Sequence, residues 1–176
     1  MPPIPPGLNT TPLALFILTL MVGAPTAVAA PGEDTAKLKI TSEGAQVRVD
    51  LRAPAVGLVG FARGPRTSAE RETLSLATQN LETGDALVRF NSQAGCWLKD
   101  ARVDSDPAPK GKSPGELGAS YVFHCDQPKL LSSAALGLFM GFPALARAHV
   151  YYEVAGAAGE AVLTPTNPVV SFVPLR

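Results

Sequence analysis

The chain has 176 residues, a length typical of one domain, and its 15 Lys and Arg residues balance 15 Asp and Glu residues. This balance argues against a nucleic-acid binder and against a polybasic membrane-surface protein, because both classes carry an excess of basic residues. Apolar residues make up 46% of the chain, which argues against disorder throughout. The two cysteines are too few to form a multi-ligand thiolate metal site by themselves.

The first 30 residues differ from the rest because they contain none of the charged side chains. An apolar run at residues 13–24 is ended by Pro25 and followed by small residues at 27–30, a pattern typical of a signal peptide. The run is too short to span a bilayer, which takes roughly 20 residues. One feature is atypical of a signal peptide: the segment before the apolar run contains no Lys or Arg. A buried core helix is the alternative interpretation.

Cleavage after Ala29 or Ala30 would release residues 31–176 as one exported domain in the periplasm. No cysteine follows the cleavage site to carry a lipid, and no second apolar stretch reaches 18 residues. We therefore expect a soluble mature protein with no membrane anchor after cleavage.

The mature chain opens with two runs of alternating side chains, at residues 37–40 and 46–52, separated by turn residues at 42–44. Apolar side chains face one way in both runs and charged side chains face the other way. This pattern predicts a β-hairpin with one buried and one solvated face, in which pairing ends at Pro54.

Glycines in the next segment, residues 56–61, predict a loop that packs on the core. The sequence TSAE at 67–70 has the spacing of a capping box, and apolar residues then recur at every third or fourth position. These signals predict the principal helix over residues 68–82, closed by Gly84.

Short strands are predicted at 87–90, 95–103 and 119–125, and the loop 104–118 between the last two is rich in Pro and Gly. In an oxidising compartment Cys96 and Cys125 are a plausible disulfide pair. Two free buried thiols, or a redox pair, are the alternatives, although no CxxC spacing supports a redox motif.

A hairpin around that long loop would place the two cysteines opposite each other. If Val103 lies opposite Gly118, the same register puts Cys96 opposite Cys125. Opposed side chains approach closely enough for a disulfide only at a non-hydrogen-bonded pair, so we predict that pair type. The register also places His124 across from Trp97.

The C-terminal part has one clear strand, at 147–154, followed by a predicted turn at 156–159 and a returning strand at 160–163. A helix-start signal precedes residues 127–131, residues 133–139 suit either helix or strand, and the Pro-containing tail predicts irregular or edge structure. The elements together predict an α+β fold with a largely antiparallel sheet, one principal helix and one disulfide.

Catalytic motifs are absent from the sequence, so we expect no enzyme. The two imidazoles, His124 and His149, are weak candidates for metal ligands. His149 and Glu153 share a strand face but lie about 13 Å apart, too far to chelate one ion alone. A solvated surface position for His149 and a contact with Trp97 for His124 are the simpler interpretations.

Several short motifs occur in a fixed order: APAVGLVGF at 53–61 with GPRT at 64–67, AGC at 94–96, YVFHC at 121–125, LF and FP within 138–143, and LTP at 163–165. This ordered set resembles the zinc-regulated periplasmic zinc-uptake proteins of the ZrgA-like family, whose segments read SPAxNIxGFEHxPxT, AxC, YxFxC, LFxxFP and LTP. The agreement runs from about residue 37 to the end and favours a strand at 133–139.

The resemblance implies a periplasmic protein tied to zinc acquisition that binds zinc and assists the binding protein of a zinc ABC importer. Family members carry histidines near the mature N-terminus and in the loop between the cysteine strands, whereas residues 31–40 and 104–118 contain none here. His124 occupies a motif position that is not usually histidine, so no ligand role is carried onto it. Because imidazole is a natural zinc ligand, we expect poor zinc affinity.

Two hypotheses follow from the sequence. The first is a zinc-uptake accessory protein that works through protein contacts or a weak zinc site. The alternative is a metal-independent periplasmic protein-interaction module on the same scaffold.

Overall fold

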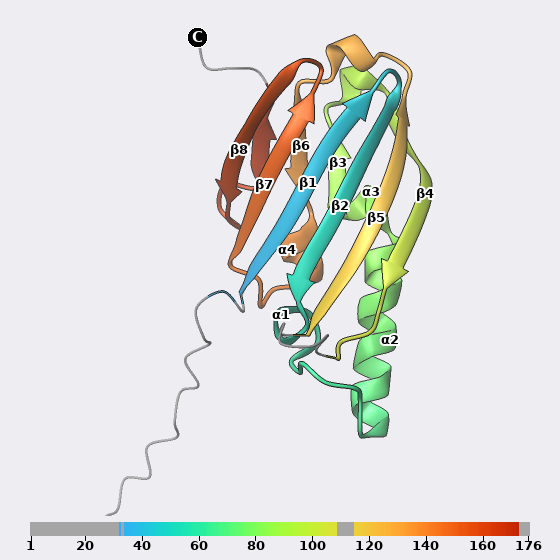
Figure 1. Cartoon of the computed structure of the whole chain (residues 1–176), viewed down its shortest axis with the longest axis vertical. Helices are drawn as coiled ribbons and strands as arrows, with labels where there is room; N and C mark the ends of the chain where they lie inside the picture. Colours follow the sequence, from blue (N-terminus) through green and yellow to red (C-terminus); the bar gives the residue numbers. More distant parts are fainter. Residues whose placement is uncertain (1–31, 33, 109–114, 173–176) are drawn as a thin grey trace, which may run out of the picture.

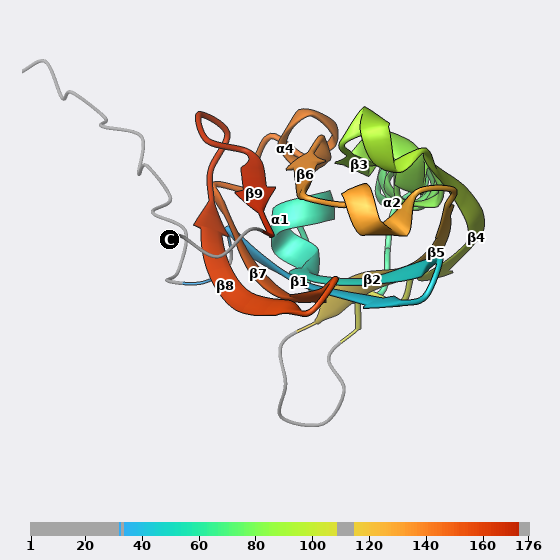
Figure 2. The same cartoon turned by 90° about the horizontal axis from the view of Figure 1, so that it is seen from above.

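The computed structural model describes residues 32, 34–108 and 115–172, so the predicted signal peptide, residues 1–30, lies outside the described residues. The chain folds into a six-stranded sheet with a layer of helices and a three-stranded sheet packed on one of its faces (Figures 1 and 2). This arrangement confirms the α+β class, the largely antiparallel sheet and the single principal helix. Among the described residues no helix is long and apolar enough to cross a bilayer.

The large sheet has the strand order β4-β5-β2-β1-β7-β8. Four of its five strand pairs are antiparallel, and the pair β1·β7 is parallel. Its strands are β1 Thr35–Glu43, β2 Gln46–Pro54, β4 Cys96–Asp104, β5 Glu116–Cys125, β7 Arg147–Val154 and β8 Ala157–Leu163.

The predicted hairpin is confirmed as β1 and β2, and it extends to Pro54 as expected. Apolar side chains on its inner face are buried, whereas opposed charged side chains such as Lys39 and Asp50 lie on the outer face. The turn itself lies at Gly44 and Ala45, one to two residues later than predicted, because Gly44 takes the left-handed conformation with φ 58°.

The small sheet has the order β3-β6-β9, with β3 Val88–Phe90, β6 Ser133–Leu136 and β9 Val169–Ser171. The short strand predicted at 87–90 and the predicted edge role of the tail are both confirmed. The expectation of a strand over 133–139 holds for its first four residues only. The chain then passes through Gly137 into the helical turn α4, Leu138–Gly141.

The principal helix is α2, Ser68–Glu82, as predicted, and its capping box is present. The backbone N–H of Glu70 donates to Thr67 Oγ1 at 3.1 Å, and the Thr67 N–H donates to the Glu70 carboxylate at 3.3 Å. The helix ends at Glu82 with Thr83 as its cap, and Gly84 begins another short helix, α3, Gly84–Leu87, instead of only closing α2.

The loop predicted at 56–61 is wrong for residues 56–59, which belong to helix α1, Ala55–Val59, whereas the predicted packing on the core is confirmed by Leu58, Val59 and Phe61. Pro54 precedes the first turn of α1 and Gly60 ends it in the left-handed conformation with φ 82°. Two 3-10 turns, η1 Ser92–Ala94 and η2 Pro128–Leu130, complete the described helices, and η2 realises the helix-start signal at 127–131.

The hydrophobic core lies between the two layers. The ring of Phe90 from the small sheet packs edge-to-face on Phe123 from the large sheet, with centroids 5.1 Å apart. In the described part of the chain no helix lies on the opposite face of the large sheet (Figure 1). The alternation along β5 and β7 places both histidines on that outer face.

Candidate functional site

The predicted disulfide joins Cys96 and Cys125 at one end of the β4·β5 pair, with their Cα atoms 3.9 Å apart. The Cys125 N–H donates to the carbonyl oxygen of Ala45 at 2.8 Å, so it points toward β2 and away from β4. The cysteines are therefore a non-hydrogen-bonded pair, as predicted. The bond ties the edge strand β4 to the body of the sheet.

Further along the hairpin the predicted register is wrong by one residue. Val103 lies opposite Ala119 rather than Gly118, because the register shifts between Leu98 and Asp100. A β-bulge at Lys99 adds one residue to β4. Its signal in the sequence is the pair of consecutive charged residues Lys99 and Asp100, both exposed, which interrupts the alternation of side chains.

His124 lies on the outer face of β5 and directly opposite Trp97, as predicted. The two rings are tilted against each other with centroids 5.5 Å apart. The Nε2 atom of His124 is 4.0 Å from an oxygen of Asp126, and both side chains are well exposed. One imidazole and one distant carboxylate make a surface contact, not a coordination shell.

His149 lies on the outer face of β7, between Lys37 on β1 and Val162 on β8. Tyr151 and Glu153 follow on the same face of the strand, as the alternation predicted. The ammonium group carried by Lys37, directly across from His149, opposes the approach of a divalent cation to this imidazole.

The sheet register places the two histidines far apart. His149 is in one row with Lys37, Arg52 and Gly118, and Gly118 lies six residues before His124 on β5. Three strand spacings and six residues along a strand correspond to about 24 Å. The two imidazoles cannot share one zinc ion, whose Zn–N distances are about 2 Å.

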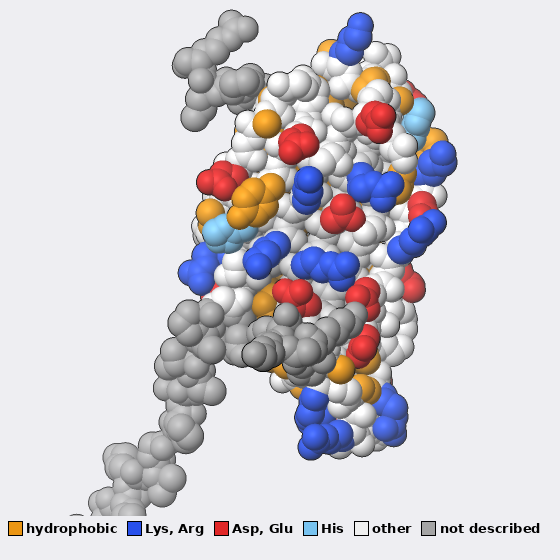
Figure 3. Space-filling model, in the orientation of Figure 1, with side chains coloured by type: hydrophobic (Ala, Val, Ile, Leu, Met, Phe, Trp, Pro, Cys, Tyr) orange, Lys and Arg blue, Asp and Glu red, His pale blue; other side chains and the backbone are white. Residues whose placement is uncertain are grey.

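Other donor groups do not complete a site around either histidine. In the described part of the chain no three His, Cys, Asp or Glu side chains are placed to hold a metal ion. The outer face instead carries interspersed charges of both signs (Figure 3). Arg52 pairs with Asp104 at 3.3 Å, and Ser120 donates to Asp50 at 2.6 Å. Asp50 and Asp104 are thus engaged with neighbouring donors.

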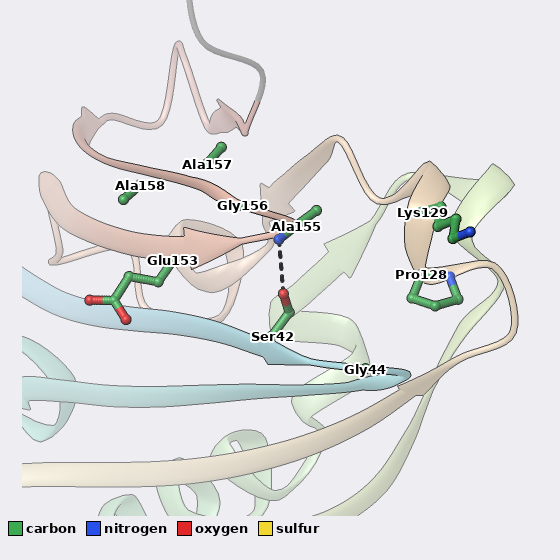
Figure 4. A pocket seen from close by; sticks show the side chains of 9 residues that line it. All are labelled: Ser42, Gly44, Pro128, Lys129, Glu153, Ala155, Gly156, Ala157 and Ala158. Carbon is green, nitrogen blue, oxygen red and sulfur yellow. Dashed lines mark hydrogen bonds between the residues drawn. The ribbon is translucent and has the colours of Figure 1, made fainter.

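A pocket of about 690 Å³ opens at the end of the domain between the β1–β2 turn, the β7–β8 turn and η2 (Figure 4). The Ala155 N–H donates to Ser42 Oγ at 2.9 Å across it. The turn predicted at 156–159 is shorter than expected, since Ala155 and Gly156 alone form it and β8 begins at Ala157. The pocket is lined mainly by alanine and glycine, so it offers few groups for orienting a ligand.

The decisive comparison is with protein families. Residues 31–172 match the family described as ZrgA family zinc uptake protein. The chain belongs to the ZrgA family. This membership confirms the resemblance seen in the motifs and associates the protein with zinc uptake. No curated protein matches the chain.

The ZrgA motifs occupy the scaffold of the fold. Within YVFHC, Tyr121, Phe123 and Cys125 are buried on the inner face of β5, and only His124 and Val122 face outward. The segment 53–61 forms the end of β2 and helix α1, and LTP ends β8. These motifs therefore identify the family through its core, and they specify no zinc ligand in this chain.

Proposed function

We propose that this ZrgA family member is a periplasmic accessory of zinc uptake that acts through protein contacts rather than by carrying zinc itself. The partner we propose is the binding protein of a zinc ABC importer, and the proposal assigns the chain no catalytic activity. One observation supports it above others: the ZrgA scaffold is kept, while its two imidazoles lie about 24 Å apart on a sheet face.

The periplasmic location is supported by the composition of residues 1–30 and by the Cys96–Cys125 disulfide. Disulfides persist in oxidising compartments such as the periplasm. Fractionation followed by intact-mass measurement should find the protein in the periplasm, beginning at residue 30 or 31. A cytoplasmic protein that still begins at Met1 would contradict export.

A growth assay tests the function in cells. We expect deletion of the gene to slow growth in zinc-chelated medium, and we expect the double variant His124→Ala, His149→Ala to restore growth as well as wild type does. A double variant with Lys37→Ala and Lys39→Ala on the same face controls for protein level. Restoration by wild type but not by the histidine variant would show that this protein handles zinc directly. A deletion without any growth defect would instead favour the metal-independent interaction module.

A further inference from the structure

The two edges of the six-stranded sheet are built differently. Strand β4 has a bulge at Lys99, and Asp100, Arg102 and Asp104 add charges along it. Strand β8 pairs with β7 in one unbroken register, and Glu160 is its only charged residue. Bulges and charges are devices that protect an edge strand from pairing with another chain. They protect the β4 edge and are almost absent from the β8 edge.

The hairpin geometry shows which groups of β8 point outward. Its two-residue turn has positive φ at both positions, 51° at Ala155 and 81° at Gly156, as a type I′ turn requires. In such a turn the closing pair, Val154 and Ala157, is hydrogen-bonded, and hydrogen-bonded pairs then alternate along the strands. The N–H and C=O groups of residues 158, 160 and 162 consequently point away from β7.

Those outward groups form no ladder with a second strand within the described residues. In the described part of the chain β8 pairs with β7 alone, and no other backbone hydrogen bond involves Ala158, Glu160 or Val162. Gly159 and Ala161 alternate with them, and the ring of Tyr152 lies against Gly159. The edge therefore offers three consecutive sites for main-chain pairing.

Side chains beside this edge define what would pair with it. Val162 is 51% exposed and Tyr151, on the neighbouring strand, is 47% exposed. Figure 3 shows the corresponding apolar patch beside a histidine at the β7–β8 side of the face. Glu160 lies opposite Tyr151, and Glu153 lies opposite Ala158. Along the edge, an apolar contact at Val162 is therefore followed by the carboxylate of Glu160 beside Tyr151, and Glu153 on the neighbouring strand adds a second carboxylate beside Ala158.

We propose that the β8 edge binds an extended segment of a partner protein by strand addition, with a basic side chain of that segment beside Glu160 and an apolar one beside Val162. Strand addition derives affinity from main-chain hydrogen bonds and specificity from alternate side chains. The proposal rests on the proposed function, because it names the surface through which an accessory would act.

A second copy of this chain fits the edge less well. The antiparallel pairing that uses all three outward positions places Glu160 directly opposite Glu160 of the other copy. Like charges directly opposite each other destabilise a strand pair. The charge of the edge therefore favours a different, basic strand over self-association.

The test uses two labelled eight-residue peptides of alternating Val and Thr that differ only in a central Lys or Glu. Fluorescence anisotropy with the purified protein should show at least tenfold tighter binding of the Lys peptide. Ala158→Pro removes an outward N–H without removing a β7 hydrogen bond and should weaken binding at least tenfold, whereas the matched control Ala158→Ser should not. Glu160→Lys should reverse the peptide preference.

Hydrogen exchange checks the edge directly. The amides of residues 158, 160 and 162 should exchange fast in the free protein and slowly with the Lys peptide bound, while those of 159 and 161 stay protected throughout. Equal binding by Ala158→Pro and Ala158→Ser would overturn the proposal. Slow exchange of the three amides without peptide would also overturn it, because the edge would then already be covered. Slow exchange that depends on protein concentration would identify a second copy as the cover, and slow exchange at every concentration would identify this chain itself. Peptide binding is measured without zinc, so a failed growth assay with intact peptide binding would reject the proposed function and not the surface.

Discussion

The hydroxyl group of Tyr121 donates a 2.6 Å hydrogen bond to the backbone carbonyl oxygen of Leu81. Tyr121 lies on the inner face of β5, and Leu81 lies in the last turn of α2, where carbonyl groups lack partners within the helix. The bond therefore fastens the end of the principal helix to the centre of the sheet. Burial raises the pKa of Tyr121, which keeps the hydroxyl protonated as a donor.

Removing that hydroxyl should destabilise the protein measurably. Tyr121→Phe leaves the Leu81 carbonyl oxygen buried without this donor, and we expect a loss of about 1–2 kcal/mol in the free energy of unfolding. Chemical denaturation measures the loss, and Tyr151→Phe on the exposed face is the matched control. Equal stabilities for the two variants would show that the bond contributes nothing.

Reduction of the disulfide should also lower stability. The bond closes a loop between cysteines 29 residues apart. By restricting the unfolded chain, a loop of this size raises the free energy of unfolding by about 3–4 kcal/mol. Thermal unfolding with and without reductant should show a clear fall in Tm, and the double variant Cys96→Ala, Cys125→Ala should match the reduced wild type. An unchanged Tm in reductant would contradict a structural role for the bond.

Local signals in the sequence predicted most of the elements. The capping box at 67–70 defined the start of α2, alternation defined β1, β2 and β7, and the two cysteines located one end of the β4·β5 pair. Each of these features depends on side chains that are neighbours in the chain or on a single possible pairing.

The features that the sequence did not predict depend on distant contacts. The parallel pairing of β1 with β7 joins residues more than 100 positions apart, and no local pattern specifies it. The bulge at Lys99 was missed although the consecutive charged residues Lys99 and Asp100 interrupt the alternation of side chains. Helix α1 was missed because its Val and Gly residues disfavour a helix. The candidate site was predictable only in part: the contact of His124 with Trp97 followed from register, whereas the open β8 edge required the strand order.

Acid should weaken the start of α2 through Glu70. Its carboxylate accepts hydrogen bonds from the Arg63 guanidinium and from the backbone N–H groups of Arg66 and Thr67. These bonds, that of Arg63 first, lower the pKa of Glu70 to about 2. Because the unfolded pKa is about 4.3, the stabilisation is complete above about pH 5 and is lost as the pH falls through 4.3 toward 2.

The comparison of wild type with Glu70→Gln isolates this contribution. We expect the difference in Tm between the two proteins to be largest above pH 5 and to shrink steadily as the pH falls toward 2. Thermal melts by circular dichroism at half-unit pH steps provide the measurement. A difference that stays constant over that range would show that the Glu70 contacts do not depend on its charge.

The β7–β8 turn should be improved by glycine at its first position. Ala155 has φ 51° and so takes the left-handed conformation, in which the Cβ atom crowds the following carbonyl oxygen. Ala155→Gly should therefore raise stability by about 0.5–1 kcal/mol, whereas Ala158→Gly in the extended strand should lower it by a similar amount. Paired thermal melts distinguish the two, and a loss of stability in both variants would contradict a left-handed Ala155.

The central claim is that this chain belongs to a zinc-uptake family but does not itself carry zinc. Calorimetric titration of the purified protein with zinc tests that claim most directly. With the two imidazoles about 24 Å apart, we expect no saturable binding at micromolar concentrations, and the same heats from the double variant His124→Ala, His149→Ala. Micromolar or tighter binding that disappears in either His124→Ala or His149→Ala would contradict the account.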